Sequence, residues 1–138
     1  MSINDQISNR TVKQITATPL PSQVFPSGAT NGSKFLAVGA KGVRFHLDAT
    51  AVSGTSPSLT VKIQVYNPVA DSYQDLAGAA FAAATAASTQ NLTVYPGIAE
   101  TANVSVSDVI SQAYRAVGTV TGSATPTVTA SVWAEYLD

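Results

Sequence analysis

Alternation of apolar and polar residues at a period of two is the feature that most constrains this chain. The clearest run covers residues 59–66, where Leu, Val and Ile at odd positions alternate with Thr, Lys, Gln and Tyr at even positions. Similar runs cover residues 43–50, 114–121 and 127–137. Successive side chains of a strand point to opposite faces, so these runs predict strands with one buried face.

Segments rich in Gly, Pro, Ser and Asn separate the alternating runs. SGTSPS follows residues 43–50 and NPVADS follows residues 59–66, and both have the composition of turns. The short run at residues 73–76 is expected to pair back on the strand before it as a hairpin. Another short strand is expected at residues 92–95, where Pro96 and Gly97 end it.

Two segments leave alternatives open. The alanine tract at residues 77–88 lacks charged i, i+4 pairs and a sustained apolar stripe, which favours irregular structure, with a helical turn as the alternative. A single helical turn is also expected near residues 107–110. Because no convincing amphipathic helix remains, the sequence predicts an all-β fold, an antiparallel β-sandwich of the jelly-roll or immunoglobulin-like kind.

The first 33 residues differ from the rest in being polar and rich in proline. We therefore expect an extended N-terminal arm at residues 1–33 and a sandwich domain at residues 34–138. The arm retains spaced apolar anchors, which are candidate contact residues: Val12, Ile15, Leu20, Val24 and Phe25. Two alternatives stay open: the arm pairs with a neighbouring subunit and inserts Phe25 there, or it folds back on its own domain as an edge strand.

Charge and composition exclude several partner classes. Seven Lys and Arg residues against eight Asp and Glu residues give a net charge of −1, too little to attract nucleic acid or an anionic membrane by charge. We find no signal-peptide pattern at the start and no apolar run of spanning length, so no membrane association is expected. The absence of Cys fits a protein made in a reducing cytoplasm.

Catalytic residues are not expected, and neither is a cofactor. The single histidine, His46, lies two residues from Asp48, so on a strand the two side chains share a face, and an imidazole oriented by Asp48 is conceivable. No G-x-S-x-G motif supplies a nucleophile, however, and a polar strand face is the favoured interpretation.

Metal and sugar sites are the remaining alternatives. Carboxylates are scattered singly, which predicts no metal site, although a weak calcium site at the turn of Asp71 and Asp75 stays open. Six aromatic residues could form a stacking platform for sugar rings, but packing is the favoured role: Tyr66, Tyr73, Tyr95, Tyr114, Trp133 and Tyr136.

Two segments within residues 41–137 carry a family pattern, GVRFHLDATAVSGTSPSLTVKIQVYNPVADSYQDLAGAA and LTVYPGIAETANVSVSDVISQAYRAVGTVTGSATPTVTASVWAEYL. In these segments the chain resembles small virion structural proteins of tailed bacteriophages. The resemblance implies a non-enzymatic capsid decoration (cement) protein or a minor head or tail component. It would form homo-oligomers, bind the major capsid protein or another virion protein, and assemble into the virion in the host cytoplasm. The alternative is a carbohydrate-binding or host-recognition module of a phage tail.

Overall fold

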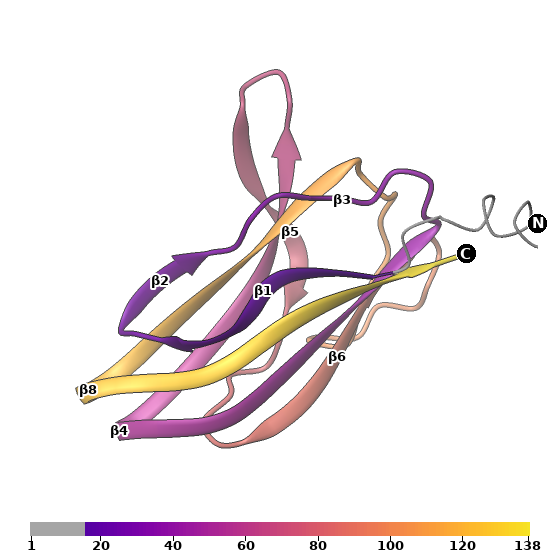
Figure 1. Cartoon of the computed structure of the whole chain (residues 1–138). Coiled ribbons are helices and arrows are strands. Elements are labelled where there is room, and N and C mark those ends of the chain that lie inside the picture. Colours follow the sequence, from indigo (N-terminus) through magenta and orange to yellow (C-terminus); the bar gives the residue numbers. More distant parts are fainter. Residues whose placement is uncertain (1–15) are drawn as a thin grey trace, which may run out of the picture.

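The structure, a computed structural model, describes residues 16–138, and that part of the chain contains strands and no helix (Figure 1). The eight strands are β1 (Thr16–Phe25), β2 (Gly28–Asn31), β3 (Phe35–Leu36), β4 (Gly42–Asn67), β5 (Ser72–Ala80), β6 (Ser88–Val94), β7 (Ser105–Val106) and β8 (Ala113–Leu137). The all-β prediction is therefore confirmed.

The strands form one open, mixed sheet with the order β1-β8-β4-β6-β7. Strands β2 and β3 also pair with β8, and β5 pairs with β4. All pairs are antiparallel except β6 with β7, which are parallel. The jelly-roll or immunoglobulin-like subtype stays a prediction.

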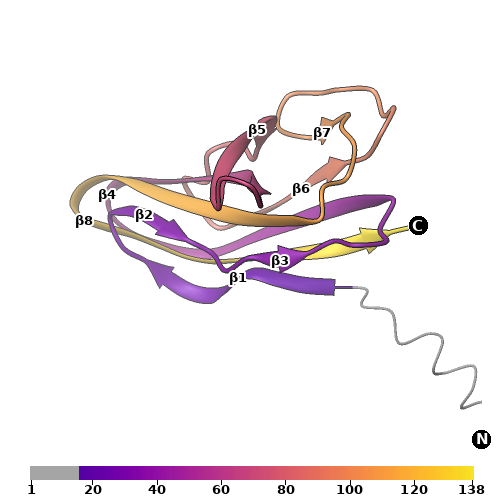
Figure 2. The ribbon, with the colours of Figure 1, turned by 90° about the horizontal axis from the view of Figure 1, so that it is seen from above.

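Strands β4 and β8 are much longer than the others, and both bend sharply near the middle. Their ladder is irregular between Ser53 and Ser58 of β4. Left-handed backbone angles occur there and at the facing part of β8, at Gly54, Ser56, Gly122, Ala124 and Thr125. Seen from above, β8 doubles back at this bend and β4 runs beside it, so that the sheet lies in two layers (Figure 2).

The first layer contains residues 42–53 of β4 and 127–137 of β8, with β1 and β6 on either side. The second layer contains residues 58–67 of β4 and 113–121 of β8, with β5 on one side and β2 and β3 on the other. Each long strand therefore contributes to both layers.

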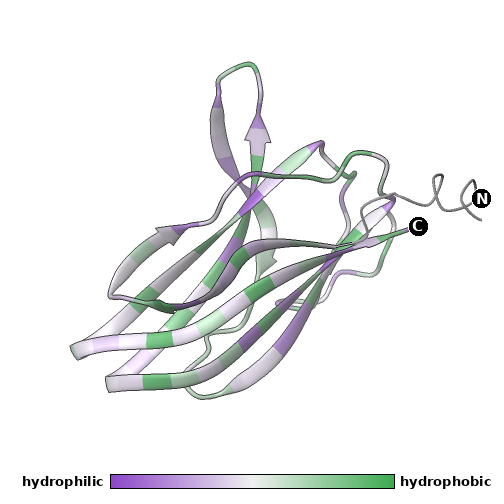
Figure 3. Cartoon of the chain, in the orientation of Figure 1, coloured by the Kyte–Doolittle hydropathy of each residue, from purple (hydrophilic) through white to green (hydrophobic). Residues whose placement is uncertain are grey.

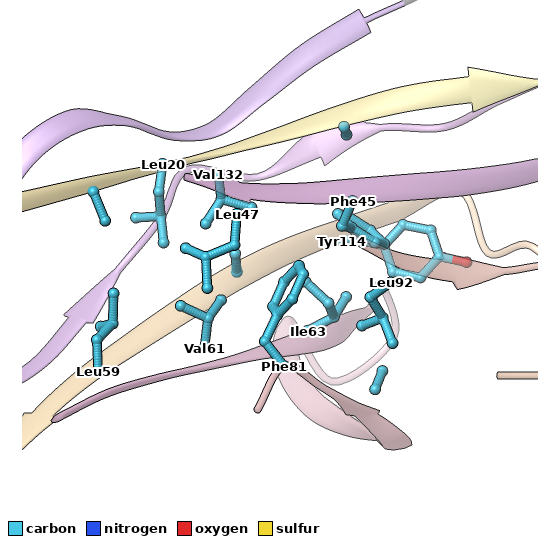
Figure 4. Packing of buried hydrophobic residues seen from close by; sticks show 14 of the residues in the cluster. Leu20, Phe45, Leu47, Leu59, Val61, Ile63, Phe81, Leu92, Tyr114 and Val132 are labelled. Carbon is cyan, nitrogen blue, oxygen red and sulfur yellow. The ribbon is translucent and has the colours of Figure 1, made fainter. Parts of the chain in front are cut away.

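The hydrophobic core lies between the two layers. Hydrophobic and hydrophilic residues alternate along β4 and β8 (Figure 3). In close view, Leu47 and Val132 of the first layer point toward Val61 and Ile63 of the second (Figure 4). All four are at most 1% exposed, as the period-two pattern of the sequence predicts.

Three aromatic rings fill one part of this core. The Phe35 and Phe45 ring centroids are 5.9 Å apart in an edge-to-face arrangement, and Phe45 and Tyr114 are 6.4 Å apart in the same arrangement. The packing role expected for Tyr114 is thus confirmed. Its hydroxyl accepts a hydrogen bond from the Ser111 amide at 2.7 Å, and burial raises its pKa.

The two ambiguous segments form no helix. Residues 77–80 of the alanine tract belong to β5, Ser88 begins β6, and residues 81–87 are irregular apart from a bridge between Ala84 and Leu59. Residues 107–110 have no regular structure, so the helical turn expected there is wrong. Among residues 16–138 there is no helix with the length and hydropathy needed to cross a membrane.

Within the described residues, regular structure is already present at Thr16 and does not wait for Lys34, because β1 and β2 pair with β8 of the same chain. Residues 16–31 therefore fold back on their own domain, which is the second of the two alternatives for the arm. Register shifts around Leu20 accommodate Pro19 and Pro21, which lack amide donors, and β1 lies at the end of the strand order, where proline is tolerated.

Candidate functional site

Two of the five arm residues are part of the core. Leu20 and Phe25 are 1% and 0% exposed, and the Phe25 ring lies against Gly118 of β8, where a Cβ would come within 2.9 Å of it. The alternative in which Phe25 inserts into a neighbouring subunit is therefore not the one seen, because Phe25 and Leu20 are both buried in the core of their own chain. Val24 is exposed, whereas Val12 and Ile15 lie outside the described residues.

His46 and Asp48 both project from the outer face of the first layer, but His46 is bonded elsewhere. Its Nε2 lies 3.0 Å from Oε1 of Glu135 on β8. Asp48 is opposite Ser131 and Thr89 on the neighbouring strands. The sequence suggested that Asp48 could orient the His46 imidazole. In the structure, the partner of His46 is instead Glu135 on the neighbouring strand.

An open hollow lies beside this pair. Its volume is about 500 Å³, and it is lined by Thr16, His46, Trp133, Ala134, Glu135 and Tyr136. His46 faces Trp133 across the β4–β8 ladder, and β1 begins at Thr16 opposite Glu135. Trp133 is 48% exposed, in contrast to its buried neighbours Val132 and Ala134.

The outer face of the second layer carries a pair of tyrosines with cations against their rings. Tyr66 and Tyr73 face each other across β4 and β5, with ring centroids 5.3 Å apart. Lys34 Nζ lies 4.1 Å from the centre of the Tyr66 ring, and the Arg115 guanidinium lies 4.0 Å from that of Tyr73. Cations thus occupy ring faces on which a sugar would have to stack.

Two carboxylates near these rings are held by hydrogen bonds. The Tyr66 hydroxyl donates to Asp71 at 2.7 Å, and this bond raises the pKa of Tyr66. Asp75 accepts hydrogen bonds from Gln64 at 2.8 Å and Lys62 at 3.1 Å, which together lower its pKa.

Asp71 and Asp75 therefore have separate partners at the turn where a calcium site was left open. Within residues 16–138 we find no cluster of three or more His, Asp or Glu side chains able to hold a metal ion.

A third surface lies at the end of the molecule that holds β3 and the C-terminus (Figure 1). Leu36 and Val38, in and just after β3, and Val109, in the segment before β8, are 57%, 72% and 72% exposed, and we call these three residues the apolar end. The Ala37 amide donates to the Gln112 carbonyl at 2.8 Å, which joins the β3 loop to the segment containing Val109. A shallow hollow of about 370 Å³ adjoins them, lined by Ala40, Lys41, Tyr95, Pro96, Val109 and Ile110.

Sequence reasoning missed Glu135 and the apolar end. Glu135 lies 89 residues from His46, so only the β4–β8 register brings them together. The valines of the apolar end stand among turn-forming residues in AVGAKG and SDVIS, which is a sign of exposed apolar side chains. The sequence around each segment does not show that the two segments lie close together. Comparison with known proteins finds no matching family model, no similar curated protein and no similar solved structure.

Proposed function

We propose that this chain is a non-enzymatic structural subunit of a tailed-phage virion that decorates and stabilises the capsid. The proposal starts from the resemblance of residues 41–137 to small virion proteins. We also propose that the fold is a β-sandwich, as the resemblance implies, and that the two layers of the folded sheet are the two sheets of this sandwich. The proposal also includes homo-oligomers on the particle surface.

The observation that carries the proposal is the apolar end. Leu36, Val38 and Val109 are large aliphatic side chains that lie more than half in solvent. Clustered exposed apolar side chains mark protein contact sites in soluble domains, because covering them removes apolar surface from water. A capsid surface provides a partner whose many identical sites bind many copies, so that each single contact can be weak.

The arrangement of the charged side chains supports a structural role. His46 pairs with Glu135, Lys62 with Asp75, and Arg115 donates to Gln64 at 2.7 Å. These groups are fixed on the outer faces of the sheet, each by a partner on a neighbouring strand. Such pairing orients a rigid surface and provides no activated nucleophile.

Binding to purified capsids of the encoding virus tests the proposal. Val38→Asp and Val109→Asp together should lower the amount of protein that cosediments with the capsids, with apparent affinity falling about tenfold or more. Val69→Asp is the matched control, because Val69 is 95% exposed in the β4–β5 turn and belongs neither to the apolar end nor to the lining of the hollow beside it.

Two results would contradict the proposal. If the wild-type protein is missing from purified particles and does not cosediment with them, the virion role is wrong. If the double variant binds like the wild type, the contact is not at the apolar end.

A further inference from the structure

The hollow beside Trp133 combines one exposed indole ring with one fixed polar pair. Along the outer face of the first layer, the neighbouring side chains on β4 are polar, namely Arg44, His46 and Asp48. Trp133 is the large aromatic side chain among them, and 48% of its surface is exposed. Leaving an indole in water is unfavourable unless something covers it, since its flat apolar area is large.

The Trp133 ring is open in a way that the tyrosines of the second layer are not. Among residues 16–138, no aromatic ring stacks on Trp133 and no Lys or Arg lies over it. Tyr66 and Tyr73, by contrast, have cations against their rings. Within the described part of the chain, Trp133 is thus available to stack with a flat ligand.

The polar pair next to this ring, His46 and Glu135, is held in place by one hydrogen bond and has further atoms that can bond to a ligand. His46 contributes Nε2 and Glu135 contributes Oε1 to their mutual bond, which is 3.0 Å long. In the described part of the chain, Nδ1 of His46 and Oε2 of Glu135 take part in no other hydrogen bond. A fixed carboxylate oxygen and a fixed ring nitrogen therefore lie at the rim of the hollow, ready for hydroxyl groups.

This combination matches the chemistry of a pyranose ring. One face of a pyranose presents aliphatic C–H groups that stack on indole, while its vicinal hydroxyls both donate and accept hydrogen bonds. A volume of about 500 Å³ lies within the range of small-molecule sites. An acidic sugar would be repelled by the Glu135 carboxylate, so a neutral sugar fits best.

The hollow is built for binding and not for hydrolysis. Glycoside hydrolases use two carboxyl groups about 5–9.5 Å apart on either side of the scissile bond. Glu135 is the single carboxylate among the residues that line this hollow. We propose that the hollow lined by Trp133, His46 and Glu135 binds a neutral pyranose at the end of a glycan, by stacking on Trp133. None of its residues belongs to the apolar end, so the inference does not rest on the capsid role.

Tryptophan fluorescence of the full chain is a direct test, because Trp133 is the only tryptophan in the sequence. We expect methyl β-glucoside or methyl β-galactoside to change the emission saturably, with a dissociation constant on the order of 1 mM. Sorbitol at the same concentrations is the control, since it has the hydroxyls but no ring face. A change no larger than that caused by sorbitol, with both glycosides, would overturn the proposal.

Variants assign the effect to the hollow, with saturation-transfer NMR of the glycoside as the readout. Trp133→Ala should weaken binding about tenfold, whereas Trp133→Tyr should retain most of it because an aromatic face remains. Glu135→Gln and His46→Ala should each weaken binding severalfold. Asp48→Asn, which changes a carboxylate on the same face outside the hollow, should have no effect. Equal binding by Trp133→Ala and the wild type would place the sugar elsewhere and refute the inference.

Discussion

The outer faces of the two layers present aromatic rings in opposite states. On the first layer, Trp133 is half-exposed beside an open hollow. On the second, Tyr66 and Tyr73 pack against each other, with Lys34 and Arg115 over their rings. A ring on a strand is therefore available to a ligand only if the side chains of the neighbouring strands leave it uncovered. A count of aromatic residues does not contain that information.

The largest expected change in stability comes from disturbing the bend of β4 and β8 that joins the two layers. Gly122 has a φ of 139°, and a Cβ there would lie 2.9 Å from the carbonyl oxygens of Thr55 and Ser56. Gly122→Ala should lower the free energy of unfolding by about 1–3 kcal/mol through backbone strain, with the clash adding to it. Chemical denaturation measures the change.

Gly97→Ala is the control for this prediction. Gly97 also has a positive φ, 83°, but a Cβ there meets no atom within 4 Å. Its loss of stability should be smaller, because only the φ penalty remains. If Gly122→Ala is no more destabilising than Gly97→Ala, the backbone at the bend is not too closely packed to accept a Cβ at residue 122.

An intermediate effect is expected from uncovering Tyr73. Arg115→Ala removes the cation from the ring and the hydrogen bond to Gln64, which should cost about 1 kcal/mol of folding free energy. It should also speed the nitration of Tyr73 by tetranitromethane, measured by peptide mass spectrometry. Arg44→Ala on the other face is the matched control, because Arg44 donates to Thr93 without covering a ring in the described part of the chain. Unchanged nitration in Arg115→Ala would show that Arg115 does not shield the tyrosine.

The smallest expected effect is a change in how stability depends on pH, and it arises from Asp75 on the outer face of the second layer. Gln64 and Lys62 lower the pKa of Asp75 below its ordinary value of 3.8. Because the folded state holds the lower pKa, this stabilisation is present above pH 3.8 and is lost as pH falls through the folded pKa. Asp75→Asn should therefore flatten the acid side of the stability profile slightly, as measured by thermal unfolding between neutral and acidic pH. An identical slope in the wild type and the variant would contradict the prediction.

Much of the fold follows from the sequence, while the sites do not. Alternation at residues 59–66 identifies both the strand and its buried face, since the period of two is a local property. SGTSPS is recognisable as a turn, but local chemistry does not distinguish a hairpin from a bend through which β4 continues to pair with β8. The prolines of β1 excluded a central strand but left an edge strand open, and β1 lies at the end of the strand order, where proline is tolerated.

The candidate sites depend on contacts across the sheet, and these are set by register. His46 meets Glu135 and Trp133 because residues 42–53 pair with residues 127–137. The one partner that the sequence suggested for His46 was the nearest carboxylate along the chain, Asp48, and a polar strand face was the favoured interpretation. The correct partner required the strand order, which depends on how all eight strands pack together.

The position of β8 has a consequence for how the protein is made. β8 pairs with β1, β2, β3 and β4, and it is the last strand in sequence. On the ribosome, these earlier strands emerge before the strand that joins them, with their apolar faces uncovered. The sheet can close only after β8 has been synthesised, so folding is expected to be late, concerted and slow, as in other proteins dominated by non-local pairing. Nascent chains that stop short of Ala113 would lack every β8 pairing and would be substrates for chaperones or proteases.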